Sequence, residues 1–122
     1  MLWVGVDCAV TTGKWTETMV NISEVLKSIN NPVRRDMLHW LKEPQHNFNL
    51  DKQLPGVDPK LDGVCVSIIQ EKTGLSQSTV SSYLSNLQRA NLVESKRIGS
   101  WTYYRRNDAL IEQFLQELAQ SL

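Results

Sequence analysis

The chain has 122 residues, of which 41% are hydrophobic and 21% charged, a composition typical of one folded domain and not of a disordered chain. No apolar run approaches the roughly 20 residues that cross a membrane. The opening MLWVGVDCAV lacks the basic start of a signal peptide, so we expect a cytoplasmic protein. The formal net charge is zero, yet residues 76–106 hold five basic residues and one acidic residue. This local excess of positive charge favours a nucleic-acid partner, which the total alone would not.

The first third of the chain predicts two helices after an irregular start. Residues 1–18 show no helical or strand period, so we expect an N-terminal arm or extension before a domain over 19–122. A first helix is predicted from about Asn21 to the break at Asn30-Asn31-Pro32, because apolar residues recur there at helical spacing. The proline of this break fits the first turn of a second helix, which Pro44 ends.

A long irregular segment follows the second helix. Residues 44–63 (PQHNFNLDKQLPGVDPKLDG) carry three prolines and two glycines without a sustained period, which predicts a loop. A loop of about 20 residues is unusual in so small a domain and is often functional. We expect Phe48 and Leu50 to anchor it, and our hypothesis is that the loop helps to form any regulatory site. The alternative is a passive loop whose apolar residues only cover the core.

The next segment predicts two helices joined by a tight turn. A short helix is expected at about 66–72, followed by the turn Thr73-Gly74 and a longer helix with Ser76 as its N-cap. The apolar residues of the longer helix recur at the spacing of one buried face. They are Val80, Leu84 and Leu87.

The opposite face of the longer helix carries small hydroxyls and amides, which are poor helix formers. Short polar side chains at a helix N-terminus allow close approach to the bases and phosphates of the DNA major groove. The competing interpretation is a helix that is merely soluble and well capped. The residues predicted to contact DNA here are Ser76, Gln77, Ser78, Thr79, Ser81 and Ser82.

Two strands, at about 92–98 and 102–106, are predicted to form a basic hairpin around Gly99. Side chains alternate between the faces of a hairpin, so only some of its basic residues can touch DNA. The predicted contacts near the tip are Lys96, Arg97 and Ser100. The aromatic residues of the hairpin are expected to pack against the domain and not to stack on bases; they are Trp101, Tyr103 and Tyr104.

The chain resembles the ArsR-type (arsenical-resistance-repressor-like) winged-helix transcriptional regulators over roughly residues 20–120. The motifs that carry the resemblance are INNPVRRDMLHWL and TGLSQSTVSSYLSNLQRANLVESKRIGSWTYYR. It implies a mainly α winged helix–turn–helix with a small β-hairpin, a homodimer paired through its first and last helices, a palindromic operator, and repression relieved by an effector. The last helix, from Asp108, agrees, because its apolar stripe is broader than a small core needs. The residues expected at the dimer interface are Ile22, Leu26, Leu110, Ile111, Phe114, Leu115 and Leu118.

The resemblance also indicates where a metal would bind. Family members that bind arsenite or soft metals carry Cys-x-Cys before the turn, where this chain has Cys65-Val66-Ser67. Others use Asp and His on the last helix, which has no His here. We therefore expect no metal and no cofactor. The alternatives left open are a metal site of His46 and Cys65 with Asp58 or Asp62, and a thiol switch between Cys8 and Cys65.

An enzyme is not expected, because the sequence has two histidines, no nucleophile motif and no glycine-rich phosphate loop. A winged-helix protein-interaction module without DNA binding is a further alternative. Such a module would be expected to lose the positive charge of residues 76–106. The sequence therefore predicts a DNA-binding transcriptional regulator that acts as a repressor.

Overall fold

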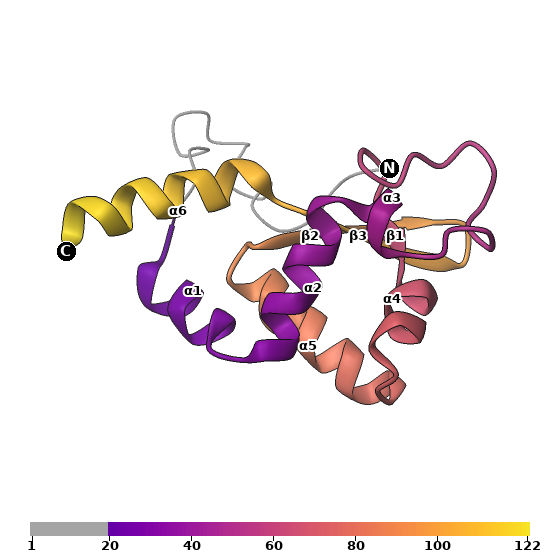
Figure 1. The fold of residues 1–122 in the computed structure, drawn as a ribbon, viewed down its shortest axis with the longest axis horizontal. Coiled ribbons are helices and arrows are strands. Elements are labelled where there is room, and N and C mark those ends of the chain that lie inside the picture. Colours follow the sequence, from indigo (N-terminus) through magenta and orange to yellow (C-terminus); the bar gives the residue numbers. More distant parts are fainter. Residues whose placement is uncertain (1–19) are drawn as a thin grey trace.

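A computed structural model describes residues 20–122, so the predicted arm at 1–18 lies outside the described residues. The described chain is mainly helical, with a small sheet at one end (Figure 1). In chain order its elements are α1 (Ile22–Ile29), α2 (Pro32–Lys42), α3 (Pro44–Asn47), β1 (Val64–Cys65), α4 (Val66–Thr73), α5 (Gln77–Arg89), β2 (Val93–Ile98), β3 (Trp101–Arg106) and α6 (Asp108–Ser121). No helix in this part of the chain is long and apolar enough to cross a membrane.

Helices α1, α2, α5 and α6 begin where a polar side chain satisfies a free backbone amide. The side-chain oxygens of Asn21, Asn31, Ser76 and Asn107 each accept a hydrogen bond from the amide three residues on, at the starts of α1, α2, α5 and α6. Pro32 occupies the first turn of α2, where a backbone N–H would have no partner inside the helix. The predicted starts of these helices are confirmed.

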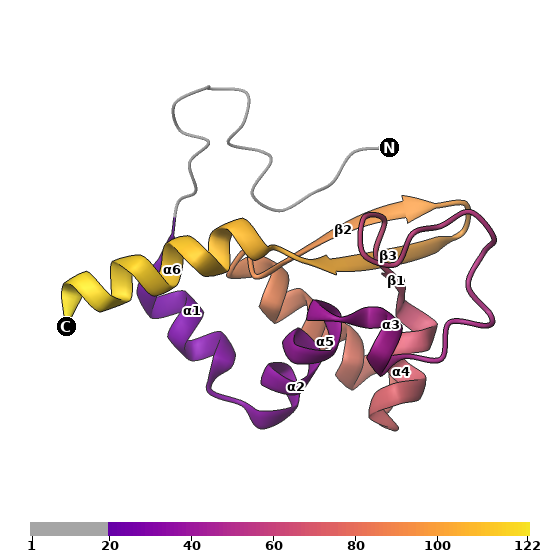
Figure 2. The same cartoon turned by 45° about the horizontal axis from the view of Figure 1, so that its top comes forward.

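The apolar faces of the helices meet in one core. Met37 of α2 and Leu84 and Leu87 of α5 are inaccessible to solvent. Burying a side chain of this size contributes about 1.5–3 kcal/mol to folding. Helix α6 lies along α1 in both views, at the end of the domain away from the hairpin (Figures 1 and 2). The core therefore connects α2 and α5 to α1 and α6.

The sheet has three antiparallel strands in the order β1-β3-β2, one strand more than the predicted hairpin. Strand β1 pairs Val64 with Tyr104 and Cys65 with Tyr103, so the end of the loop becomes an edge of the sheet. Gly63 permits this approach, because its φ is +100° and a Cβ there would lie 2.7 Å from the carbonyl oxygen of Tyr104. A two-residue strand leaves no alternation in the sequence, which is why the sequence does not predict it.

The segment over 44–63 is mostly irregular, as predicted, but it begins with the short helix α3. Phe48 is buried, and its ring meets that of Trp40 edge to face with the centroids 6.2 Å apart. Leu50 packs against the same core. The prediction that Phe48 and Leu50 anchor the loop is confirmed. Beyond them the loop runs beside the β2–β3 hairpin in both views (Figures 1 and 2).

Candidate nucleic-acid interface

A sharp turn between α4 and α5 sets the direction of the polar helix. Gly74 has a φ of +72°, a left-handed conformation that glycine adopts without steric cost. The hydroxyl of Thr73 accepts a hydrogen bond from the Leu75 amide at 3.1 Å, and Ser76 accepts one from the Thr79 amide at 3.2 Å. The Ser76 hydroxyl also donates to that of Thr79 at 2.9 Å. These two hydroxyls therefore hold the start of α5 in addition to any contact they make with DNA.

The polar face of α5 lies toward solvent while its apolar face is buried in the core. Thr79 is half-buried beside its partner Ser76. The predicted contacts that lie exposed along the first two turns are Gln77, Ser78, Ser81 and Ser82. These four residues lie on one side of α5, opposite its buried residues Val80, Leu84 and Leu87.

Two residues that were not predicted from the sequence extend this exposed face toward the end of α5. Ser85 and Arg89 are exposed, and they follow Ser81 and Ser82 at spacings of three to four residues. Arg89 adds a cation at the far end of the polar face. The helical spacing of the predicted contacts, continued for two more turns, would have found both residues.

The hairpin, which forms the wing of the motif, presents fewer cations at its tip than predicted. Arg97 and Ser100 are exposed. Lys96 lies on the other face of the hairpin, where its Nζ is 2.9 Å from Oδ1 of Asp62 and its side chain is only 13% exposed. The prediction of Lys96 as a tip contact is therefore corrected: it is an internal ion-pair partner of the loop.

The aromatic residues of the wing also differ from one another. Tyr103 is buried and Tyr104 is half-buried, so both pack against the domain as predicted, and burial raises the pKa of each. Trp101 does not, because it is 51% exposed. Its place at the first position of β3, next to the turn, leaves it without core neighbours, and the packing prediction for this residue is wrong.

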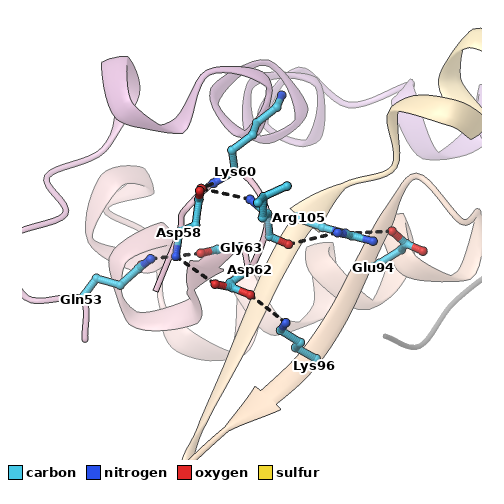
Figure 3. Close-up of polar contacts among 9 residues, drawn as sticks. Gln53, Asp58, Lys60, Asp62, Gly63, Glu94, Lys96 and Arg105 are labelled. Atoms are coloured by element: carbon cyan, nitrogen blue, oxygen red, sulfur yellow. Dashed lines mark hydrogen bonds and ion pairs between the residues drawn. The ribbon is translucent and has the colours of Figure 1, made fainter. Parts of the chain in front are cut away.

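A polar network joins the loop to the wing (Figure 3). The Asp62 carboxylate accepts hydrogen bonds from the Asp58 amide and from Lys96 Nζ, both at 2.9 Å, and these bonds hold the pKa of Asp62 below its usual value. Arg105 donates to the Leu61 carbonyl at 3.0 Å and to the Glu94 carboxylate at 3.1 Å. The loop is thus fastened to both strands of the wing.

The terminal helices expose part of the apolar surface that was assigned to a dimer. Leu26 of α1 and Leu115 of α6 are 43% and 56% exposed. The prediction that Leu110 and Phe114 lie at the dimer interface is corrected, because both are buried in the core of the protomer and offer no surface to a partner. The half-buried residues of the predicted interface are Ile22, Ile111 and Leu118.

Cys65 is buried, and its Sγ lies 3.3 Å from the hydroxyl of Ser67, which stands where a second thiol would be needed. Its amide donates to the side chain of Gln53 in the loop. His46 is exposed. Within residues 20–122, no three His, Cys, Asp or Glu side chains gather closely enough to hold a metal ion. Cys8, the other half of the thiol alternative, lies outside the described residues.

Comparisons with known proteins agree with this geometry. Residues 64–95, which include β1, α4, α5 and the start of β2, match the model of the bacterial regulatory proteins of the arsR family. The chain is 44% identical over 88 residues to the HTH-type transcriptional regulator YbzH of Bacillus subtilis, covering 72% of this chain and 85% of YbzH. It is 32% identical over 97 residues to the Halobacterium salinarum protein named "Putative arsenical resistance operon repressor ArsR2", covering 80% of this chain and 68% of that protein.

A solved structure shares the fold. It is the homodimeric winged helix–turn–helix DNA-binding domain Mb0332 of Mycobacterium bovis, with a TM-score of 0.55 at 23% identity, over 82% of this chain and 77% of that one. The predicted fold class is confirmed, and the family consists of transcriptional regulators and not of enzymes. The chain belongs to the arsR family of bacterial transcriptional regulators, and its winged helix is a DNA-binding one.

Proposed function

We propose that this chain is a homodimeric repressor that reads a palindromic operator with α5 and is released by an effector. The single observation that carries the proposal is the exposed face of α5, where small polar side chains line one side of a helix whose other side is buried. A helix of this kind fits the major groove, where each base pair presents its own pattern of donors and acceptors.

The residues of this face divide into two roles. Gln77 is the residue for reading a base, because a side-chain amide can donate to and accept from the same base edge. The hydroxyls of Ser78, Ser81 and Ser82 are short enough to let the helix backbone approach the groove. Arg97 on the wing and Arg89 at the end of α5 are the cations that we assign to phosphates.

The dimer is proposed to form through α1 and α6. Exposed Leu26 and Leu115 lie on these two helices, which pack together within the protomer. Both helices also carry half-buried apolar residues, namely Ile22 on α1 and Ile111 and Leu118 on α6. Exposed apolar side chains on two packed helices favour a second copy of the chain, related by twofold symmetry.

The domain over residues 19–122 is proposed to act as one unit in which the loop braces the wing. Lys60 donates to the carbonyl oxygen of Lys42 at 2.8 Å and lies 3.5 Å from the carboxylate of Asp108. Asp62 of the same loop holds Lys96. The loop therefore touches the end of α2, the start of α6 and the wing, which is the position from which an effector could alter how the wing meets DNA.

Selection of bound fragments from a random duplex pool tests the proposal. We expect enrichment of a palindrome whose half-site centres lie about one helical turn, roughly 34 Å, apart. Sedimentation of the full chain at micromolar concentration should give a dimer. A monomer, or a pool that shows no sequence enrichment, would contradict the proposal, and the latter result together with a captured protein partner would favour the interaction-module alternative.

A further inference from the structure

A cavity of about 280 Å³ opens between α1, α2 and α6. Its floor is apolar and is made by residues of all three helices. The residues that form this floor are Val25, Ile29, Leu38, Ile111, Phe114 and Leu115. Ligand pockets have this character, a mostly apolar lining with a few polar groups at defined places.

The charged groups that line the cavity are cations. Arg35, Lys42 and Arg106 line it beside His39, and the described residues that border it include no carboxylate. The Arg35 guanidinium donates to the carbonyl oxygen of Ile29 at 2.6 Å, which fixes its position at the rim. The rim is therefore built to receive a single negative charge above an apolar floor.

Carboxylates border a second hollow next to the cavity. This hollow shares Lys42, Arg106, Ile111 and Leu115 with the cavity and is bordered by Asp108 and Glu112. Asp108 Oδ1 lies 2.9 Å from Arg106 Nε, an atom that is buried and makes no hydrogen bond of good geometry. Arg106 is thus paired with a carboxylate outside the cavity, and the cations left to meet a ligand are Arg35 and Lys42 of α2.

We propose that this cavity binds a small amphipathic monocarboxylate, with its carboxylate at Arg35 and Lys42 and its apolar tail on the floor. The volume limits the size of the ligand. At about 30 Å³ for each non-hydrogen atom, the room that a water molecule takes in the liquid, the cavity holds roughly nine such atoms. A carboxylic acid of about this size fits the cavity, whereas a nucleotide or a long-chain lipid does not.

The cavity adjoins the elements through which a bound ligand could affect DNA binding. Ile111 and Leu115 border the cavity and also belong to the apolar face assigned to the dimer, while Leu92 lies between the end of α5 and the first strand of the wing. A ligand there would bias the packing of α6 on α1. In the proposed dimer it would thereby alter the separation of the two α5 helices. This regulatory consequence rests on the proposed function, whereas binding of the carboxylate does not.

Titration calorimetry of the full chain with octanoate, and with its neutral counterpart octanamide, tests the site. We expect one octanoate per protomer and binding of octanamide at least ten-fold weaker, because the amide loses the charge-assisted bonds to the rim. Lys42→Gln and Arg35→Gln should each weaken octanoate about ten-fold. Lys52→Gln is the matched control, since this exposed lysine lies on the loop beside Glu71 and does not line the cavity.

A second measurement keeps the test valid if a variant folds poorly. In methyl NMR of the wild-type chain, octanoate should shift the signals of Val25, Ile29 and Ile111, while Val80 on the buried face of α5 stays unchanged. Absence of saturable binding up to millimolar octanoate, equal affinity for the amide, or shifts confined to other residues would overturn the proposal. Sedimentation and DNA binding are recorded in parallel, so octanoate that binds without releasing DNA would overturn only the regulatory consequence.

Discussion

Asp62 and Lys96 lie 34 residues apart in the chain, and their 2.9 Å ion pair fastens the loop to the wing. The Lys96 side chain is 13% exposed and that of Asp62 is 32% exposed, so the pair is better shielded than a fully exposed surface salt bridge. The Asp58 amide donates a further hydrogen bond to the Asp62 carboxylate. Removing either partner should therefore loosen the wing and not only remove a surface charge.

The first prediction concerns Asp62→Asn and pH. Hydrogen bonds from the Asp58 amide and Lys96 hold the pKa of Asp62 below the ordinary 3.8. A lowered pKa contributes stability that is present above the unfolded value and is lost as pH falls through the folded value. The variant should lose about 1 kcal/mol of unfolding free energy at pH 7. That difference should shrink below pH 3.8, as measured by urea denaturation across the pH range.

The matched control for this experiment is Asp51→Asn, because Asp51 is exposed on the same loop. It should leave the unfolding free energy unchanged within a few tenths of a kcal/mol. If Asp62→Asn were equally silent, or if its effect were the same at pH 3 and pH 7, the ion pair would have no role in bracing the wing.

The second prediction concerns base reading by α5. Gln77→Ala should weaken operator binding by about 1–3 kcal/mol and relax the preference at one base pair, because it removes an amide that contacts a base edge. Fluorescence anisotropy with the selected operator and with single-base variants measures both effects. Gln45→Ala, which removes an exposed side-chain amide on α3, is the matched control. A uniform loss on all sequences would assign Gln77 to the phosphates and not to a base.

The third prediction separates the two neighbouring cations of the wing. Arg97→Ala should weaken specific and random DNA alike and reduce the slope of log K against log salt by about 0.9 for each phosphate that the variant no longer binds. Lys96→Ala should leave that slope unchanged and instead lower the unfolding free energy, because it leaves Asp62 without its partner. Equal salt slopes for the two variants would show that the division between the faces of the wing is wrong.

The helices could be predicted from the sequence because each satisfies a local rule. Asn31 followed by Pro32, and Ser76 followed by a periodic apolar face, mark starts that depend on neighbouring residues only. Strand β1 and the pairing of Lys96 with Asp62 depend on contacts between distant segments. Alternation along β2 does place Lys96 and Arg97 on opposite faces, but no local pattern says which face the loop covers.

The broad apolar stripe of α6 illustrates the same limit at the candidate dimer surface. Leu110 and Leu115 are both apolar and lie on one helix, so spacing assigned both to the interface. The structure separates them, because Leu110 is buried against the protomer's own core while Leu115 is exposed. Which part of a wide stripe meets the core depends on how α6 is rotated on α1, and that rotation is a property of packing and not of period.

The fourth prediction concerns this exposed leucine. Leu115→Glu should convert the dimer to a monomer at micromolar concentration without unfolding it, because a charge would be buried against the partner's apolar surface. Leu122→Glu, on the almost fully exposed residue that ends the same helix, controls for the added charge. Sedimentation gives the mass, and circular dichroism confirms the fold. A Leu115→Glu variant that remains dimeric would place the interface elsewhere.

The fifth prediction concerns arsenite and zinc. Neither should release DNA at concentrations that saturate the metal-sensing members of the family, because Cys65 is buried and Ser67 stands where a second thiol would be needed. Operator binding is measured by anisotropy with each ion for the wild type, for Cys65→Ser and for Cys8→Ser. The three proteins should respond alike. Stoichiometric binding of either ion that is lost in Cys65→Ser but kept in Cys8→Ser would establish a metal site at Cys65, and would require the loop above it to open and supply the remaining ligands.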